Sequence, residues 1–156
     1  YSPQTDILES YSIAKYLFNK HSAKPMTDKN EILKIALQNE YSCKEIAFII
    51  DYLKATVNEE IIKLACEKAS DYVVDYLFIN YKFPNQEIAD TSFELAINNK
   101  KITKANDNTI ETRMFKAQTK FKPNITQELL DKIPENHSIK SFLNEKFEEQ
   151  QKLETK

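Results

Sequence analysis

The chain has 156 residues, 41% of them hydrophobic, and a formal net charge of -2 at pH 7. This length suits a single domain or a short repeat array, and the near-neutral charge gives no overall attraction to nucleic acid or membranes. The sequence contains no glycine. Phosphate-binding loops and dinucleotide-binding turns need glycine because their backbone must approach the ligand, so nucleotide-binding enzymes of these types are disfavoured.

The first residue and the cysteines indicate the context of the chain. It begins at Tyr1 and not at a methionine, so we expect a piece of a longer protein. No apolar run approaches the roughly 18 residues of a membrane span, and no segment resembles a signal peptide. Cys43 and Cys66 form no C-x-x-C pair and have no nearby histidine. We expect two reduced thiols, at least one of them buried, in an intracellular compartment; a disulfide between them is the alternative.

Apolar residues recur at helical spacing along the first third of the chain. Polar residues that cap helices and short polar stretches that form turns separate these segments. The expected elements are, in order, a helix capped by Ser10 or Ser12 and ending near Lys20, a loop over 21–30, a helix over 31–38, a turn over 40–42 and an apolar helical stripe from Ile46 to Leu53.

The clearest unit of the sequence lies between residues 64 and 78. Asn58 is expected to cap the helix that leads into it, with two glutamates at the positive end of that helix. A tight turn and a second short helix follow, whose apolar stripe consists of Val73, Val74, Leu77 and Phe78. The next segment is a loop over 80–85 that contains a proline, followed by a helix that Asp90 or Thr91 caps and that ends near residues 98–99.

The helical pattern weakens after Lys100. No strand pattern competes with helix anywhere in the chain. The expected elements are an irregular polar stretch over 102–108, a helix that starts at Asn108 or Thr109, an interruption at Pro123, a short helix over 126–133, a last helix capped by Ser138, and a charged tail that frays beyond Glu148.

No group of residues in the sequence has the spacing of a catalytic or metal site. His21 and His137 are far apart and neither has a cysteine or histidine at ligand spacing, so we expect no metal and no cofactor. Cys66 lies in an apolar helical register, which favours packing over nucleophilic catalysis. The carboxylate pairs Glu59–Glu60 and Asp71–Asp75 are typical of a helix start and a solvated face. We therefore expect a protein that is not an enzyme.

Three alanines mark a repeat. Ala36, Ala65 and Ala96 follow one another at intervals of 29 and 31 residues, and each has apolar residues one and three positions before it. A second helix is expected about eight residues after Ala36 and Ala65, whereas the unit after Ala96 loses its second helix in polar sequence. Units of this length are the supersecondary units of helical arrays, in which each unit is stable only when packed against its neighbours.

This pattern resembles a degenerate ankyrin repeat array, with the closest match in the unit around Ala65. Ile62, Leu64 and Ala65 match the family's first helix, Val73, Val74 and Leu77 match its second helix, and Thr91 matches its threonine in the next unit. The family's turn glycine is absent; Glu40, Ala69 and Lys100 stand in its place, and Lys34, Lys63 and Glu94 replace its histidine. Another solenoid of helix pairs and a compact all-α bundle are the alternatives.

The resemblance implies an all-α fold, a short α-solenoid of ankyrin-like helix pairs over residues 1–100 with a C-terminal helical cap over 101–156. It implies a non-catalytic, monomeric protein-interaction module, part of a larger intracellular protein. The degenerate repeats, the lack of glycine and the richness in lysine and asparagine also suit an effector that a microbe delivers into a host cell. Partner-binding residues are then expected on the first helices and on the longest loop between units: Lys34, Gln38, Lys63, Glu67, Glu94 and Asn98, with Tyr81, Lys82 and Phe83. The two aromatic residues are hot-spot types, but they equally suit packing back onto the array.

Basic residues outnumber acidic ones between Thr91 and Gln127, against the mildly acidic balance of the whole chain. This local excess gives a second hypothesis, a domain that binds phosphoinositides, other anionic ligands or nucleic acid; a solvated surface is the simpler interpretation. The candidate residues are Lys100, Lys101, Lys104, Arg113 and Lys116.

Overall fold

The structure, a computed structural model, describes residues 29–105, 109–135 and 139–154, and it describes the side chains of these residues except 103–105. The helix expected before Lys20 and the cap at Ser138 lie outside these ranges. All regular elements within them are helical, which confirms the all-α class. They are α2 (Lys29–Gln38), α3 (Cys43–Asp51), α4 (Glu59–Lys68), α5 (Asp71–Phe78), α6 (Gln86–Asn98), α7 (Lys100–Ala105), the π-helix η1 (Thr109–Lys116), α8 (Gln127–Asp131) and α9 (Lys140–Glu154).

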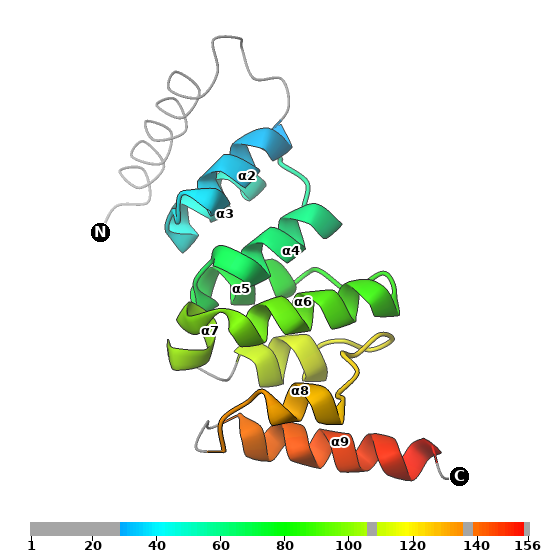
Figure 1. Cartoon of the computed structure of the whole chain (residues 1–156). Helices are drawn as coiled ribbons and strands as arrows, with labels where there is room; N and C mark the ends of the chain where they lie inside the picture. Colours follow the sequence, from blue (N-terminus) through cyan, green and yellow to red (C-terminus); the bar gives the residue numbers. More distant parts are fainter. Residues whose placement is uncertain (1–28, 106–108, 136–138, 155–156) are drawn as a thin grey trace.

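The helices lie in two rows. In the first row α4 packs against α2 on one side and against α6 on the other. In the second row α5 packs between α3 and η1. Figure 1 shows these elements one below another, with α8 and α9 paired at the end of the molecule.

The three alanines of the repeat lie inside the first row. Ala36, Ala65 and Ala96 each have an exposed fraction of 0%, on α2, α4 and α6 respectively. Alanine has the smallest side chain that still favours a helix, so it lets neighbouring helices approach closely. The apolar residues next to them continue into one hydrophobic cluster that runs from Ile32 to Leu143.

Helix caps explain several of the observed boundaries. Asn58 caps α4 as expected, accepting a hydrogen bond from the backbone N–H of Ile61 at 2.9 Å. The Thr126 hydroxyl accepts from the N–H of Leu129 at 3.1 Å and so starts α8. Each cap satisfies one of the donors that a helix leaves unpaired in its first turn.

The start of α6 differs from the expectation. Neither Asp90 nor Thr91 caps this helix; Asn85 does, through a 2.9 Å hydrogen bond from the N–H of Ile88. The buried residues of α6 include Ser92, which has an exposed fraction of 0%. A polar residue on the buried face interrupts the apolar periodicity, so the first turn of the helix was not recognised in the sequence.

Substitution of Asn85 tests this assignment. We expect Asn85→Ala to lower the free energy of unfolding by about 1 kcal/mol, because the N–H of Ile88 loses its partner. Thr91 is exposed inside α6, so Thr91→Ala should change that free energy by less than about 0.5 kcal/mol. Urea unfolding of the two variants beside the wild type measures both. Equal losses would show that Asn85 does not start the helix.

The C-terminal part is more ordered than expected. Residues from Lys100 form α7, where Ile102 enters the core with an exposed fraction of 0%. The tail does not fray beyond Glu148, since α9 continues to Glu154. The Gln150 amide donates to the Ile125 carbonyl at 2.8 Å and accepts from its N–H at 2.9 Å, which holds the last turns of α9 against the preceding segment.

Candidate interaction surface

The residues implied on the first helices lie at successive positions of α2, α4 and α6. Gln38, Glu67, Glu94 and Asn98 are exposed, whereas Lys34 and Lys63 are half-buried, as the sequence and burial rows show. Because the three helices pack side by side, these positions lie on one row of the molecule. The row presents lysine, glutamate and amide side chains and therefore suits polar contacts more than apolar ones.

An ion pair links two helices of this row. The Lys34 ammonium lies 2.7 Å from the carboxylate of Glu60 on α4 and 3.7 Å from that of Glu31 on its own helix. The hydrogen bond to Glu60 raises the pKa of Lys34 above its usual value. Partly exposed pairs of this kind stabilise proteins little.

The loop after α5 packs inward. The Phe83 ring is 3% exposed and meets the Phe78 ring edge-on, with ring centroids 5.2 Å apart. The half-buried Tyr81 meets the same ring at 5.9 Å, and Lys82 donates a hydrogen bond to the Ala117 carbonyl. Of the two interpretations that the sequence left open, packing back onto the fold is the one observed. Phe83 is therefore not an exposed partner-binding anchor.

Gln118 fixes this loop and was not recognised in the sequence. It is 1% exposed, and its carbonyl oxygen accepts from the Phe83 N–H at 3.0 Å. Its amide donates to the carbonyls of Tyr81 at 3.3 Å and Arg113 at 3.1 Å. One side chain thus supplies partners to backbone groups of two segments that are at least 30 positions apart, a relationship that local sequence patterns do not contain.

Lys101, one of the anionic-ligand candidates, contacts two earlier helix pairs. Its ammonium donates to the Glu40 carboxylate in the turn after α2 and, at 3.1 Å, to the Lys68 carbonyl at the end of α4. Glu40 takes a φ of 58°, the left-handed conformation that glycine adopts more readily. The Lys101 hydrogen bond lowers the pKa of Glu40. The Lys101 side chain therefore connects α7 to the turn after α2 and to the end of α4.

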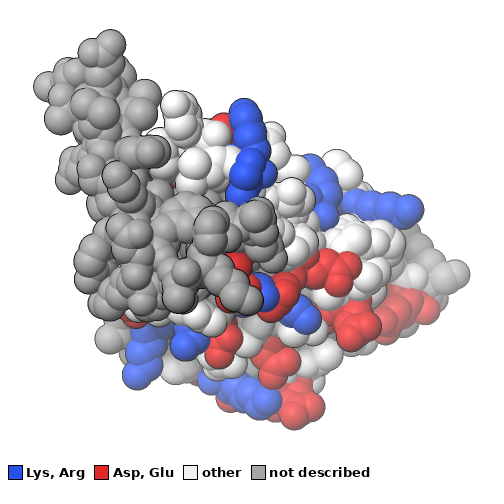
Figure 2. All heavy atoms as spheres, turned by 90° about the horizontal axis from the view of Figure 1, so that it is seen from above, with Lys and Arg blue, Asp and Glu red and all other residues white. Residues whose placement is uncertain are grey.

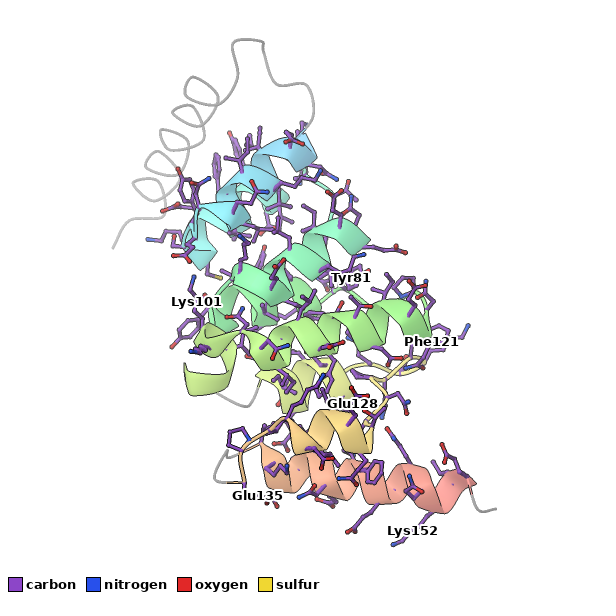
Figure 3. All side chains as sticks on the ribbon, in the orientation of Figure 1. Tyr81, Lys101, Phe121, Glu128, Glu135 and Lys152 are labelled. Carbon is purple, nitrogen blue, oxygen red and sulfur yellow. The ribbon has the colours of Figure 1, made fainter. Side chains whose placement is uncertain are left out.

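Two of the other basic candidates lie on η1, whereas Lys101 lies on α7. Arg113 pairs with Asp75 at 2.6 Å and Lys116 pairs with Glu111 at 2.9 Å. Lys100 is exposed, and the side chain of Lys104 lies outside the described part. In Figure 3, Lys101 lies at one edge of the molecule and Phe121 at the other. The engaged residues are neutralised locally by their own carboxylates, which weakens their attraction for a further anion.

The cysteines and the Asp71–Asp75 pair differ in burial and pairing. Both cysteines are free, as expected, and burial raises the pKa of the Cys66 thiol to about 12, which keeps it protonated and unreactive. Of the two residues expected on a solvated face, Asp71 is buried, with an exposed fraction of 5%, whereas the Asp75 side chain is 40% exposed and pairs with Arg113. Among the described residues, no three His, Cys, Asp or Glu side chains are grouped as metal ligands; both histidines lie outside them.

Acidic and basic side chains are interspersed on the face that Figure 2 shows, and neither sign forms a continuous field there. No helix in the described ranges has the length and apolar character that crossing a bilayer requires. No family model, curated protein or solved structure matches the chain. The candidate surface is therefore defined by its own geometry: the polar row on α2, α4 and α6.

Proposed function

We propose that this chain is a non-catalytic protein-interaction module, built as a short array of ankyrin-like helix pairs closed by α8 and α9. The observation that supports it is the burial of Ala36, Ala65 and Ala96 at corresponding places of α2, α4 and α6. Stacked units of this kind bury a shared core and leave an extended surface free for a partner. In this proposal, the polar row on α2, α4 and α6 forms that surface.

The chemistry of the row indicates the kind of partner. Exposed Gln38, Glu67 and Asn98 offer donors and acceptors, and the Lys34–Glu60 pair offers charges of both signs. A partner with a polar, mixed-charge surface fits this set better than an apolar peptide, because unpaired polar groups buried under an apolar partner would cost binding energy. We infer a folded protein surface as the partner.

A matched pair of triple variants tests this function. The first carries Gln38→Arg, Glu67→Arg and Asn98→Arg on the row. The control carries Gln127→Arg, Glu145→Arg and Asn80→Arg, which replace the same residue types at exposed positions outside α2, α4 and α6. Wild-type protein and both variants are used as baits for extracts of the source cells, and captured proteins are quantified by mass spectrometry.

We expect at least one protein to be retained by the wild type and the control but lost by the row variant. Binding of that purified protein should weaken by about tenfold or more in the row variant, which corresponds to about 1.4 kcal/mol. Circular dichroism of the three proteins checks that the helices persist. Capture that is equal for all three baits, or greatest for the row variant, would contradict the proposed surface.

A further inference from the structure

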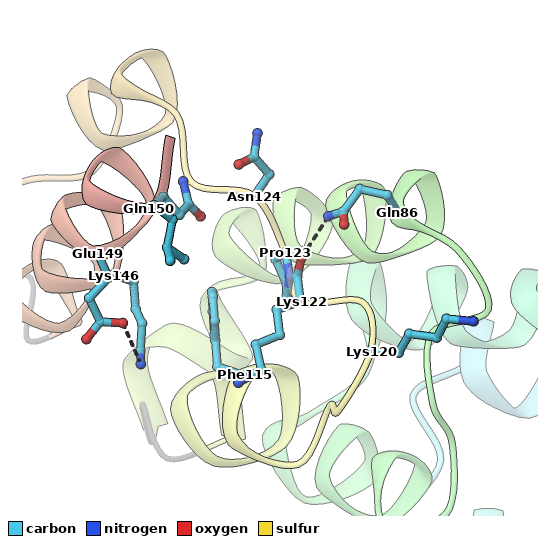
Figure 4. A pocket seen from close by; sticks show the side chains of 10 residues that line it. Gln86, Phe115, Lys120, Lys122, Pro123, Asn124, Lys146, Glu149 and Gln150 are labelled. Carbon is cyan, nitrogen blue, oxygen red and sulfur yellow. Dashed lines mark hydrogen bonds and ion pairs between the residues drawn. The ribbon is translucent and has the colours of Figure 1, made fainter. Parts of the chain in front are cut away.

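A groove separate from the polar row lies between α9 and the extended segment 117–126. Its volume is about 580 Å³. Lys122, Pro123 and Asn124 line one side, and Lys146 and Gln150 line the other, as Figure 4 shows. A concave site of this size suits an extended polypeptide segment or a small molecule.

Side-chain hydrogen bonds fix both walls of the groove. The Gln86 amide donates to the Lys122 carbonyl at 2.7 Å, and the Asp90 carboxylate accepts from the Asn124 N–H at 2.8 Å. The double hydrogen bond between Gln150 and Ile125 joins the segment to α9. The groove is therefore formed before a ligand arrives, which lowers the ordering cost of binding.

The groove carries an excess of positive charge. It is lined by Lys120, Lys122 and Lys146, against a single carboxylate, that of Glu149. Lys146 lies 3.4 Å from Glu149 in a partly exposed pair, and the Lys120 ammonium lies 5.3 Å from the centre of the Phe121 ring. In the described residues neither Lys120 nor Lys122 has a carboxylate within ion-pair distance. The uncompensated charge favours an acidic ligand.

The groove also contains an exposed apolar side chain beside its charged ones. Leu153, on the last turn of α9, lines the groove and is 75% exposed, although most large apolar side chains of the described part are buried. Buried Pro123 forms part of the opposite wall. An apolar side chain of a ligand would cover Leu153 and remove it from water, which is favourable at about 25 cal/mol per Å² of apolar area.

We propose that this groove binds an acidic, extended segment of a partner protein, with carboxylates on Lys122 and Lys146 and one apolar side chain against Leu153. A chain in an extended conformation fits between the two walls. A flat membrane surface would meet only the rims. The site is independent of the polar row, so the two surfaces are separable by mutation.

The probe is a fluorescein-labelled peptide, Glu-Glu-Leu-Glu-Glu-Leu-Glu-Glu, titrated with the whole chain by fluorescence anisotropy at low ionic strength. A second peptide has glutamine at every glutamate position, and vesicles of phosphatidylserine and phosphatidylcholine form a third arm. The groove variant is Lys122→Glu with Lys146→Glu. The control, Lys100→Glu with Lys132→Glu, makes the same change in net charge at exposed positions outside the groove.

We expect the acidic peptide to bind, and the groove variant to weaken that binding by about tenfold or more while the control changes it by less than about threefold. Added salt should weaken binding, since exposed charges are screened. Leu153→Ser in the otherwise wild-type chain should also weaken binding of the acidic peptide. The salt dependence of that binding should not change, because no charge is removed. Equal losses in the two double variants, equal binding of the glutamine peptide, or preference for vesicles would each overturn the proposal. None of these results bears on the polar row.

Discussion

Replacement of Gln118 by leucine is expected to lower the free energy of unfolding by about 2–4 kcal/mol. Leucine has a similar volume but no polar atoms. Gln118→Leu therefore leaves the Phe83 N–H and the carbonyls of Tyr81 and Arg113 without their side-chain partner. Because Gln118 is only 1% exposed in the wild type, water does not readily take its place. Each buried group that loses its hydrogen bond costs roughly 1–3 kcal/mol, and local relaxation toward water recovers part of that cost.

Urea unfolding monitored by circular dichroism measures this loss, and amide hydrogen exchange locates it. The Phe83 amide should exchange faster in Gln118→Leu than global unfolding alone accounts for, because its acceptor is gone. Gln127→Leu is the control, since Gln127 is exposed and its amide donates to the Asp131 carboxylate of its own helix, at 2.8 Å. A loss below about 1 kcal/mol, or an unchanged rate at Phe83, would show that Gln118 does not fix the loop.

The sequence predicted the features that depend on neighbouring residues. Helical spacing of apolar residues indicated the helices from 31 to 98, and Asn58 was recognised as a cap because an Asn before an acidic first turn is a local signal. The alanine interval also follows from spacing alone. These features need only contacts between residues a few positions apart, which the order of the chain makes explicit.

Other features depend on pairs that are distant in sequence, and the sequence did not reveal them. Lys140 is an example. It stands in the first turn of α9, is 6% exposed, and donates to the carbonyls of Leu130 and Ile133 at the end of α8. A lysine at a helix C-terminus is favourable because of the helix dipole. The sequence, however, does not state which helix end a lysine will reach.

The loop aromatics illustrate the same limit. Phe83 is an aromatic residue beside a proline in a polar stretch, a pattern that suits an exposed anchor as well as a buried one. Its burial follows from Phe78 on α5 and from Gln118, 35 positions later. Tertiary contacts decide between the two outcomes, and composition alone carries no information about them. The groove beside α9 was missed for the same reason, since Lys122 and Lys146 are joined only by the fold.

Asn99→Ala is expected to have an effect as large as that of Gln118→Leu, a loss of about 2–4 kcal/mol in the free energy of unfolding. The Asn99 amide donates to the carbonyls of Cys66 at 3.0 Å and Ala69 at 2.8 Å, at the end of α4. Its carbonyl oxygen accepts from the Lys101 N–H at 3.0 Å and so starts α7. The last carbonyls of a helix have no partner within it, so a residue of the next helix pair satisfies those of α4.

The neighbouring asparagine provides the control. Asn98 is exposed, and among the described residues its amide donates to the Glu94 carbonyl in its own helix, at 3.1 Å. Asn98→Ala should therefore change the free energy of unfolding by less than about 0.5 kcal/mol. Asn99→Asp should be at least as damaging as Asn99→Ala at neutral pH, because a carboxylate offers only acceptors to the two carbonyls. Urea unfolding of the three variants compares them.

These variants also test how the helix pairs depend on one another. If α4 ends correctly only when Asn99 reaches back to it, exchange protection should fall in the last turn of α4, near Cys66 and Ala69, as well as in α7. A loss confined to α7 would mean that Asn99 stabilises only its own segment. In that case coupling between adjacent units, which an array of helix pairs requires, would rest on the apolar contacts around Ala65 and Ala96 and on the hydrogen bonds of Lys101.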